Sequence, residues 1–253
     1  MDIRLMRITS IIRTSTASLV SNGMTTITRT INYVKDYDTL SEMAANIVRK
    51  EIHRSNTTVL GLPTGGTPIG MYEKLVKDKT IDWRFVQTFN LDEYVGIDPN
   101  HPESYRNFMA RHFHNHVNIP KEYIYFPDPN NPDKYDDLIA QRGGIDLLVM
   151  GMGTNGHVAF NEPGTNMMSE THITDLTEQT IKDNSRFFNS IDEVPTQAVT
   201  MGLRTILGAQ KILLLVTGKK KLKVLQKAIW KPDYNIPVSI INNHRKVEIL
   251  YCD

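Results

Sequence analysis

Short β-type runs that alternate with amphipathic helical segments constrain the fold of this chain more than any other feature. Leu40, Ala44, Ile47 and Val48, for example, recur at helical spacing around a capping box at residues 39–42. The other segments with helical spacing are 69–76, 105–113, 135–139 and 219–230. The β-type runs are 31–34, 57–60, 85–91, 145–150, 212–216 and 247–251. Strands and helices that alternate in this way predict an α/β fold, in which helices cover both faces of a largely parallel sheet.

Composition narrows the classes of protein to which the chain can belong. Its 253 residues suit one large α/β domain, and a formal net charge of +1 gives no global field that would attract nucleic acid or an anionic membrane. The longest apolar run, 212–216, is too short to span a bilayer. Cys252 is the single cysteine, which argues against a disulfide framework and a thiolate metal site and indicates a reducing compartment. A metal is not expected at the other cluster of potential ligands, because no acidic partner of a His-Glu-x-x-His site accompanies His112, His114 and His116.

Residues 1–30 differ from the rest of the chain. They are rich in Ser and Thr and contain one acid, Asp2, beside the arginines Arg4, Arg7, Arg13 and Arg29. This bias is typical of an organellar transit peptide, but an upstream start codon with Met24 as the working initiator explains it equally well. We set this extension apart and predict a single domain over residues 31–253. The expected location is the cytoplasm, unless residues 1–30 direct the protein to an organelle.

Three motifs follow directly on predicted strands. They are the Thr-Gly-Gly-Thr loop at 64–67, the pair Asp92 and Glu93, and the glycine-rich loop at 151–164. In a largely parallel sheet, ligands bind outside the carboxyl ends of the strands. We therefore expect the three motifs to meet in one active site.

The loop at 64–67 enters a helix, and its amides and hydroxyls are suited to bind a small phosphomonoester. It lacks the lysine of a Walker A loop and the spacing of a dinucleotide fingerprint. A plain strand–turn–helix junction remains the alternative. Arg186 and Lys221 are further candidates for phosphate binding, with a surface charge and a solvated helix start as their respective alternatives.

The other two motifs contain groups that transfer protons. Asp92 and Glu93 are adjacent in extended structure, so their side chains point in opposite directions and only one should face the site. Either is a candidate general base, with helix capping or solvation as the alternative. In the glycine-rich loop, His157 can move a proton near neutral pH and Glu162 can orient it.

Several segments together resemble the glucosamine-6-phosphate deaminase family, also called the glucosamine/galactosamine-6-phosphate isomerase family. These segments, in the family's order, are 61–68, 89–96, 101–105, 156–163 and 184–188. The resemblance extends from about residue 31 to the C-terminus and implies a Rossmann-like three-layer αβα sandwich. It also implies conversion of D-glucosamine 6-phosphate and water to D-fructose 6-phosphate and ammonia in amino-sugar catabolism, with no metal or organic cofactor.

The resemblance further implies roles for individual residues. Asp92 matches the general base that moves a proton between C2 and C1 of the open-chain sugar. His157 matches the residue that opens the pyranose ring, and Glu162 matches the carboxylate that orients it. The positions that hold the phosphate are matched by Thr64, Gly65, Gly66, Thr67, Arg186 and Lys221.

Three features depart from the family pattern. Asn155 stands where many members have Asp; it can hold the imidazole by a hydrogen bond but supplies no negative charge, so we expect activity with a different pH profile. His172 and Thr174 occupy positions that are basic in allosterically regulated members, so activation by N-acetylglucosamine 6-phosphate is not expected. The C-terminus is short, which weakens the inference to the hexamer of the longer enzymes and leaves a homo-oligomer open.

Two other functions agree less well with the sequence. A 6-phosphogluconolactonase shares the fold and a Gly-x-Gly-x-x-Gly-His loop, but its loop does not continue as residues 160–163 do, and it lacks a segment like 89–94. A sugar-phosphate-sensing transcription regulator needs a helix-turn-helix, and residues 1–30 are too short and too weakly periodic to supply one. An enzyme that acts on a sugar phosphate is therefore the expected function.

Overall fold

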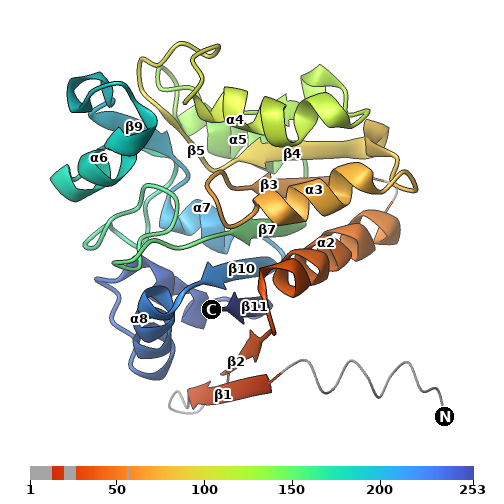
Figure 1. Cartoon of the computed structure of the whole chain (residues 1–253), viewed down its shortest axis with the longest axis vertical. Helices are drawn as coiled ribbons and strands as arrows, with labels where there is room; N and C mark the ends of the chain where they lie inside the picture. Colours follow the sequence, from red (N-terminus) through yellow and green to blue (C-terminus); the bar gives the residue numbers. More distant parts are fainter. Residues whose placement is uncertain (1–12, 20–26, 56) are drawn as a thin grey trace.

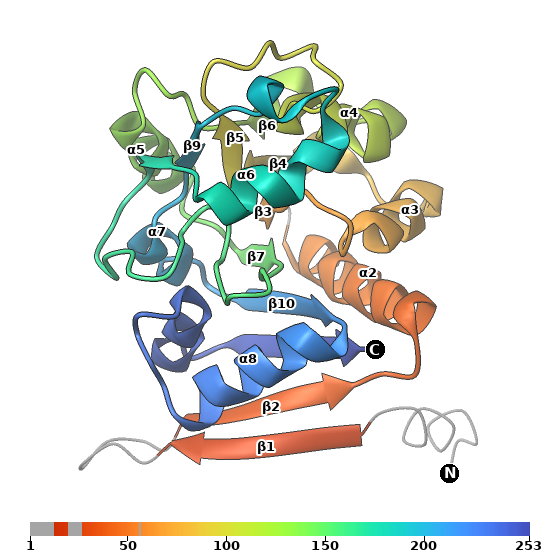
Figure 2. The ribbon, with the colours of Figure 1, turned by 60° about the vertical axis from the view of Figure 1, so that its left-hand side comes forward.

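The central sheet is mostly parallel, as the sequence predicts. The computed structural model describes residues 13–19, 27–55 and 57–253. Within them, eight strands form a sheet in the order β1-β2-β11-β10-β7-β3-β4-β6 (Figure 1; β6 is labelled in Figure 2). Each neighbouring pair is parallel except β1 and β2, which are antiparallel. The strands are β1 (Arg13–Leu19), β2 (Ile27–Tyr33), β3 (Thr58–Leu62), β4 (Val86–Asn90), β6 (Ile124–Tyr125), β7 (Leu147–Met150), β10 (Ile212–Thr217) and β11 (Val247–Cys252).

Helices cover both faces of this sheet, which gives the three layers that the family resemblance implies. Buried side chains from α2, α3 and α4 pack on one face, and those from α5, α7, α8 and η6 pack on the other. The helices are α2 (Tyr37–Arg54), α3 (Ile69–Lys77), α4 (Tyr105–His112), α5 (Asp133–Gln141), α6 (Glu178–Asn184), α7 (Leu203–Leu207) and α8 (Lys219–Trp230). The short 3-10 turns are η1 (Trp83–Phe85), η2 (His114–His116), η3 (Lys121–Tyr123), η4 (Ser185–Phe187), η5 (Ile191–Glu193) and η6 (Pro237–Asn243).

Alternation along the central strands connects the sequence to this layering. In β10, Ile212, Leu214 and Val216 belong to one buried cluster, whereas Leu213 and Leu215 belong to the other. Successive side chains of a strand point to opposite faces, so a continuous apolar run fills the core on both sides of the sheet. The sheet thereby holds the carboxyl ends of its parallel strands at one fixed edge.

A second, smaller sheet was not predicted from the sequence. It has the strand order β5-β9-β8 and is antiparallel, and it consists of β5 (Asp92–Tyr94), β9 (Gln197–Thr200) and β8 (His172–Asp175). Its strands are only three or four residues long, and β8 alternates between half-buried and exposed positions. Such short, partly polar runs carry little periodic signal. This sheet matters for function because Asp92 is its first residue.

Part of the N-terminal extension belongs to the main sheet. Figure 2 shows β1 as the outermost strand, next to β2. Arg29 is 2 % exposed, and its guanidinium donates hydrogen bonds to the backbone carbonyls of Ile241 and His244. The side chain of Arg29 is therefore part of the folded domain. Residues 1–12 and 20–26, which include Arg4, Arg7 and Met24, lie outside the described residues, so targeting and an upstream start both remain untested predictions.

Within the described part of the chain, no helix combines the length and the apolar character that crossing a membrane requires.

Candidate active site

The three predicted motifs meet in one cavity of about 440 Å³ at the carboxyl ends of β3, β4 and β7. The candidate residues that line it include Asp92, His157, Arg186 and Lys221, together with the whole 64–67 loop. Aromatic side chains from separate elements complete the wall, namely Tyr94, Tyr105, Phe108, Phe160 and Phe188. Asn155 and Glu162 join the site through their contacts with His157.

The 64–67 loop is held in a tight turn before α3. Gly65 has a φ of +90°, a left-handed conformation that glycine adopts without strain. The Tyr37 hydroxyl lies 3.1 Å from the carbonyl oxygens of both Gly66 and Thr67, to which it donates, and it accepts from the Gly70 amide at 2.9 Å. Tyr37 therefore fixes the loop against the first turn of α3. Its contacts use carbonyl oxygens of the loop and the amide of Gly70, so the amides of residues 64–67 stay available to bind an anion.

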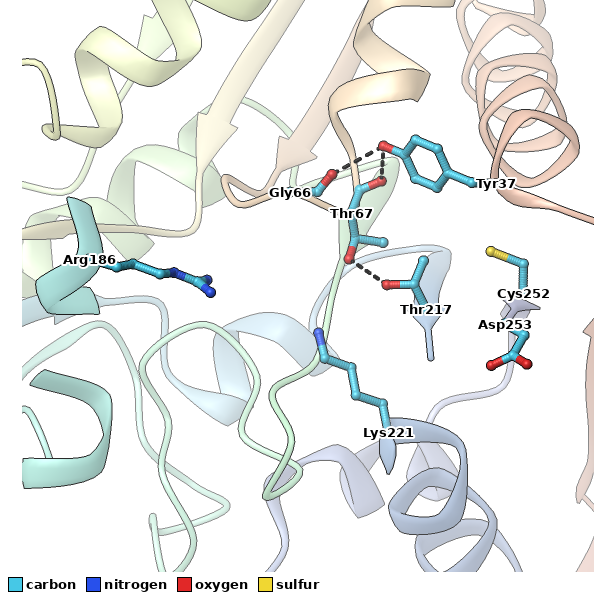
Figure 3. Close-up of a pocket in the computed structure, with 8 residues that line it drawn as sticks. All are labelled: Tyr37, Gly66, Thr67, Arg186, Thr217, Lys221, Cys252 and Asp253. Carbon is cyan, nitrogen blue, oxygen red and sulfur yellow. Dashed lines mark hydrogen bonds between the residues drawn. The ribbon is translucent and has the colours of Figure 1, made fainter. Parts of the chain in front are cut away.

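Two cations face the same space beside this loop. An adjoining cavity of about 430 Å³ shares Gly66, Thr67, Arg186 and Lys221 with the first. Figure 3 shows the Arg186 and Lys221 side chains reaching toward Thr67 from η4 and α8, and the Thr67 hydroxyl lies 3.3 Å from that of Thr217. Burial lowers the pKa of Lys221 below its ordinary value. A bound anion would offset that cost, because an opposite charge stabilises the ammonium.

The structure separates the two carboxylates that the sequence left as alternatives. Asp92 is 6 % exposed and lines the cavity. Glu93 accepts hydrogen bonds at 2.9 Å from the backbone amides of Tyr94, Tyr105 and Arg106. Glu93 thereby satisfies amides in the first turn of α4, where a carboxylate is favourable. Capping explains Glu93, and Asp92 is the carboxylate left to act in the cavity.

Burial changes the acidity of Asp92. It raises the pKa of this carboxyl to about 8, and the negative charge of Glu93 adds to the effect. A carboxyl with this pKa is protonated at neutral pH unless a cationic group lies close to it. Once ionised, it is a much stronger base than an ordinary aspartate. A group of this kind in a cavity is typical of an active site.

His157 is held by a network centred on Glu162. The distance from His157 Nδ1 to Glu162 Oε1 is 3.6 Å. Asn155 Nδ2 donates to Glu162 Oε2 at 2.7 Å, and Asn155 Oδ1 accepts from the His157 backbone amide at 3.1 Å. We expected Asn155 to hold the imidazole by a hydrogen bond; these two bonds run to the main chain and to the carboxylate that faces the ring. A short side chain two residues before His157 is well placed for such a turn.

The glycine-rich loop is shaped around the imidazole. A Cβ atom at Gly153 would lie 2.1 Å from Cε1 of His157, so only glycine leaves room for the ring there. Asn161 is fully buried and donates to the carbonyls of Val158 and Met201 at 3.0 and 2.7 Å. Asn161 thereby ties the loop to the residue that follows β9. These constraints limit the positions that His157 can take.

The buried histidine of the α4 and η2 cluster, His114, has a structural role. His114 is buried, and its Nε2 lies 3.2 Å from the Thr88 hydroxyl. Burial, with a smaller effect of Arg106, lowers its pKa to about 4. Among the described residues, no group of three or more His, Cys, Asp or Glu side chains is arranged to hold a metal ion.

With this geometry established, comparison with known proteins places the chain. Residues 36–250 match the family model described as glucosamine-6-phosphate isomerases/6-phosphogluconolactonase. The chain belongs to this family. This match confirms the resemblance found in the sequence. The family description covers both isomerases and lactonases, and the names of individual relatives are more specific than the family description.

Curated relatives carry the name glucosamine-6-phosphate deaminase. One from Thermoanaerobacter sp. (strain X514) is 44% identical over 225 residues, which cover 85% of this chain and 89% of the relative. Another, from Halalkalibacterium halodurans, is 44% identical over 226 residues, covering 85% and 92%. A solved structure described as a monomeric glucosamine-6-phosphate deaminase has a TM-score of 0.85 and 36% identity, covering 88% of this chain and 96% of that one.

A lactonase structure shares the fold alone. The 6-phosphogluconolactonase of Thermotoga maritima has a TM-score of 0.73 at 21% identity, covering 88% of this chain and 99% of that one. Isomerases and lactonases of the family thus share the layers described above, and the side chains of the site must distinguish the chemistry.

Some residues of the site received no role from the sequence. Asn184 Nδ2 donates to the Tyr94 hydroxyl at 2.8 Å, and the rings of Tyr105 and Phe160 are stacked with centroids 5.8 Å apart. These four residues lie inside the family-like segments, so a signal was present. Thr180, which donates to Glu162 at 2.6 Å, lies outside those segments, and nothing in its local sequence distinguishes it.

Proposed function

We propose that the protein is a glucosamine-6-phosphate deaminase, which converts D-glucosamine 6-phosphate and water to D-fructose 6-phosphate and ammonia. The observation that carries this proposal is the placement of a buried Asp92 and a carboxylate-paired His157 in one cavity with a loop suited to phosphate. A lactone hydrolysis needs no base at a carbon atom. A deaminating isomerisation needs one base at carbon and another group at the ring oxygen.

In this proposal, the phosphate group anchors the substrate in the cavity. Amides and hydroxyls of residues 64–67 surround it, with Arg186 and Lys221 opposite them. The phosphate is remote from the reacting carbons, so its binding energy orients the sugar and is available for positioning C1 and C2. Arg and Lys supply charge-assisted hydrogen bonds for this purpose.

His157 then opens the pyranose ring. The imidazole takes the proton from the O1 hydroxyl and returns a proton to the ring oxygen, which breaks the bond between C1 and that oxygen and leaves an aldehyde at C1. Glu162, which faces Nδ1 at 3.6 Å, stabilises the imidazolium that forms between these two transfers. Asn155 keeps the carboxylate in that orientation.

Asp92 moves the carbon-bound proton. Its carboxylate removes the proton from C2, the electron pair forms the C1–C2 double bond, and the π pair of the C1 aldehyde moves to O1. O1 takes a proton from the substrate's ammonium group, which gives an enolamine. Asp92 then returns its proton to C1, the nitrogen lone pair forms an iminium at C2, and water hydrolyses this iminium to the ketone and ammonium, which is released as ammonia. The ammonium group of the substrate favours the ionised state of Asp92 when it enters the cavity, since an opposite charge lowers a carboxyl pKa.

We further propose a role in amino-sugar catabolism in the cytoplasm, without activation by N-acetylglucosamine 6-phosphate. His172 and Thr174, the residues on which the last point depends, lie in β8. Both a monomer and a homo-oligomer agree with the proposal.

Ammonia and fructose 6-phosphate should appear in equal amounts when the purified protein is mixed with glucosamine 6-phosphate. The assay is run with and without N-acetylglucosamine 6-phosphate, and with Asp92→Asn as the inactive control. Absence of ammonia at saturating substrate would contradict the proposed function. Activation by the acetylated sugar would contradict only the regulatory part.

A further inference from the structure

The Thr180 hydroxyl connects α6 to the carboxylate that faces His157. Thr180 is half-buried and lines the cavity, and its Oγ1 donates to Oε1 of Glu162 at 2.6 Å. This is the same carboxylate oxygen that lies 3.6 Å from His157 Nδ1. With Asn155 on Oε2, both oxygens of Glu162 have a donor, and a carboxylate held at both ends has little freedom to rotate.

A second hydroxyl extends this contact. Thr177 is the N-cap of α6, and its Oγ1 accepts from the Thr180 backbone amide at 3.2 Å. The same oxygen donates to Thr180 Oγ1 at 3.0 Å. The hydrogen bonds therefore run from Thr177 through Thr180 to Glu162, and bonds in such a chain strengthen one another.

The segment that carries Thr180 also reaches the phosphate side of the cavity. Residues 177–188 comprise the cap Thr177, α6, η4 and Phe188. Asn184 in this segment donates to the Tyr94 hydroxyl, and Arg186 points into the space beside Thr67 (Figure 3). The segment 177–188 thus contacts Glu162, the carboxylate that faces His157, and also contributes the cation Arg186 to the phosphate side of the cavity.

We propose that Thr180 is a positioning residue for ring opening, and that through it the segment 177–188 links phosphate binding at Arg186 to the orientation of Glu162. This inference rests on the function proposed above. A phosphate that holds Arg186 also holds α6, and α6 in turn holds Glu162 against the imidazole. Without the hydroxyl, Oε1 loses its donor in a site where Glu162 is 9 % exposed, and the carboxylate turns away from His157.

Replacement of the hydroxyl by an isosteric methyl tests the positioning role. Thr180→Val should lower kcat for ammonia release by about 10- to 100-fold with little change in KM, because the substrate still binds but its ring opens slowly. Thr180→Ser keeps the hydroxyl and should restore most of the activity. Thr196→Val, at an exposed threonine outside the cavity lining, is the matched control and should match the wild type. Equal losses in the Val and Ser variants, or wild-type kcat in Thr180→Val, would overturn the role of the hydroxyl.

A double-mutant cycle tests the link to the phosphate. If Arg186 acts on Glu162 through Thr180, the loss in kcat/KM of Arg186→Ala combined with Thr180→Val is smaller than the product of the two single losses. A loss equal to that product means that the two residues act independently and overturns the link. The wild-type assay separates these outcomes from failure of the proposed function, since that failure appears as no ammonia from the wild type itself.

Discussion

The two ends of the cavity differ in their functional groups and in how far these groups are buried. At the phosphate end, Gly65, Gly66 and Arg186 are exposed, and the loop offers mainly backbone donors held by Tyr37. At the proton-transfer end, Asp92 is 6 % and Glu162 is 9 % exposed, and both act through side chains. An anion can thus be bound at a solvated edge, whereas proton transfer at carbon needs a group whose basicity is set by burial.

Asp92→Asn should have the largest effect and should break the proton-transfer end alone. Loss of the general base is expected to lower kcat by about 10⁴-fold, since the amide cannot accept the C2 proton. Binding of inorganic phosphate, measured by calorimetry, should stay close to that of the wild type. Substantial ammonia release by the variant would assign the base elsewhere.

The same substitution should stabilise the fold at alkaline pH. The pKa of Asp92 is raised to about 8 in the folded state, so folding retains a proton that the unfolded chain releases near its ordinary value of about 4. The contribution of this proton to the free energy of unfolding is fully present below pH about 4 and is lost as the pH rises to about 8. Asp92→Asn lacks that loss and should exceed the wild type by about 1–3 kcal/mol at pH 8 in urea unfolding. A variant no more stable than the wild type at pH 8 would contradict the raised pKa.

His157→Gln should have the next largest effect, about 100-fold on kcat, because ring opening then proceeds without an acid or base. KM should change little, since the phosphate contacts remain. The rise of kcat/KM with pH that is due to Asp92 should persist in this variant. His53→Gln, on an exposed part of α2, is the control, and an equal loss there would indicate a general effect on folding.

Lys221→Ala should act on binding at the other end of the cavity. Removal of one charge-assisted hydrogen bond to phosphate is expected to raise KM by about 10- to 100-fold, from about 1.5–3 kcal/mol. The value of kcat should fall less, because Asp92 and His157 stay in place. Lys223→Ala, an exposed neighbour on α8, is the matched control. A selective fall in kcat would place Lys221 in the chemistry instead.

The sequence predicted the layers and the edge of the sheet that holds the site because these depend on local periodicity. The continuous apolar run at 212–216 and the helical spacing in 219–230 can each be read from a single short segment. Ser- and Thr-rich residues also suit an edge strand, so the composition that suggested a transit peptide is equally compatible with β1. Local composition could not separate these interpretations.

The contacts that could not be predicted connect residues far apart in the chain. Alternation in a strand indicated that only one of Asp92 and Glu93 faces the cavity, but Glu93 is identified as a cap by amides 12 and 13 residues away. Thr180 donates to Glu162 across 18 residues, between helix α6 and the glycine-rich loop, whose mutual position only the tertiary fold sets. The 64–67 loop also depends on a distant residue, because the Tyr37 hydroxyl that holds it lies 29 and 30 residues before Gly66 and Thr67.

Asn155→Asp should have the smallest effect, and the sign of that effect tests whether His157 depends on added charge or on the hydrogen bond that Asn155 donates to Glu162. The family pattern that the sequence resembles has Asp here in many members, which on that resemblance alone would favour added charge beside His157. In this chain, however, Asn155 donates to Glu162 at 2.7 Å, and an aspartate there would place a second carboxylate against the first. Like charges at that distance share a proton, and Glu162 loses a donor. We therefore expect kcat to fall about tenfold near neutral pH, equivalent to one charged hydrogen bond of about 1.5 kcal/mol, and the loss to grow as the pH rises and the shared proton leaves. A pH series of kcat for the variant and the wild type measures this, and higher activity of Asn155→Asp at alkaline pH would show that charge matters more here than the donor.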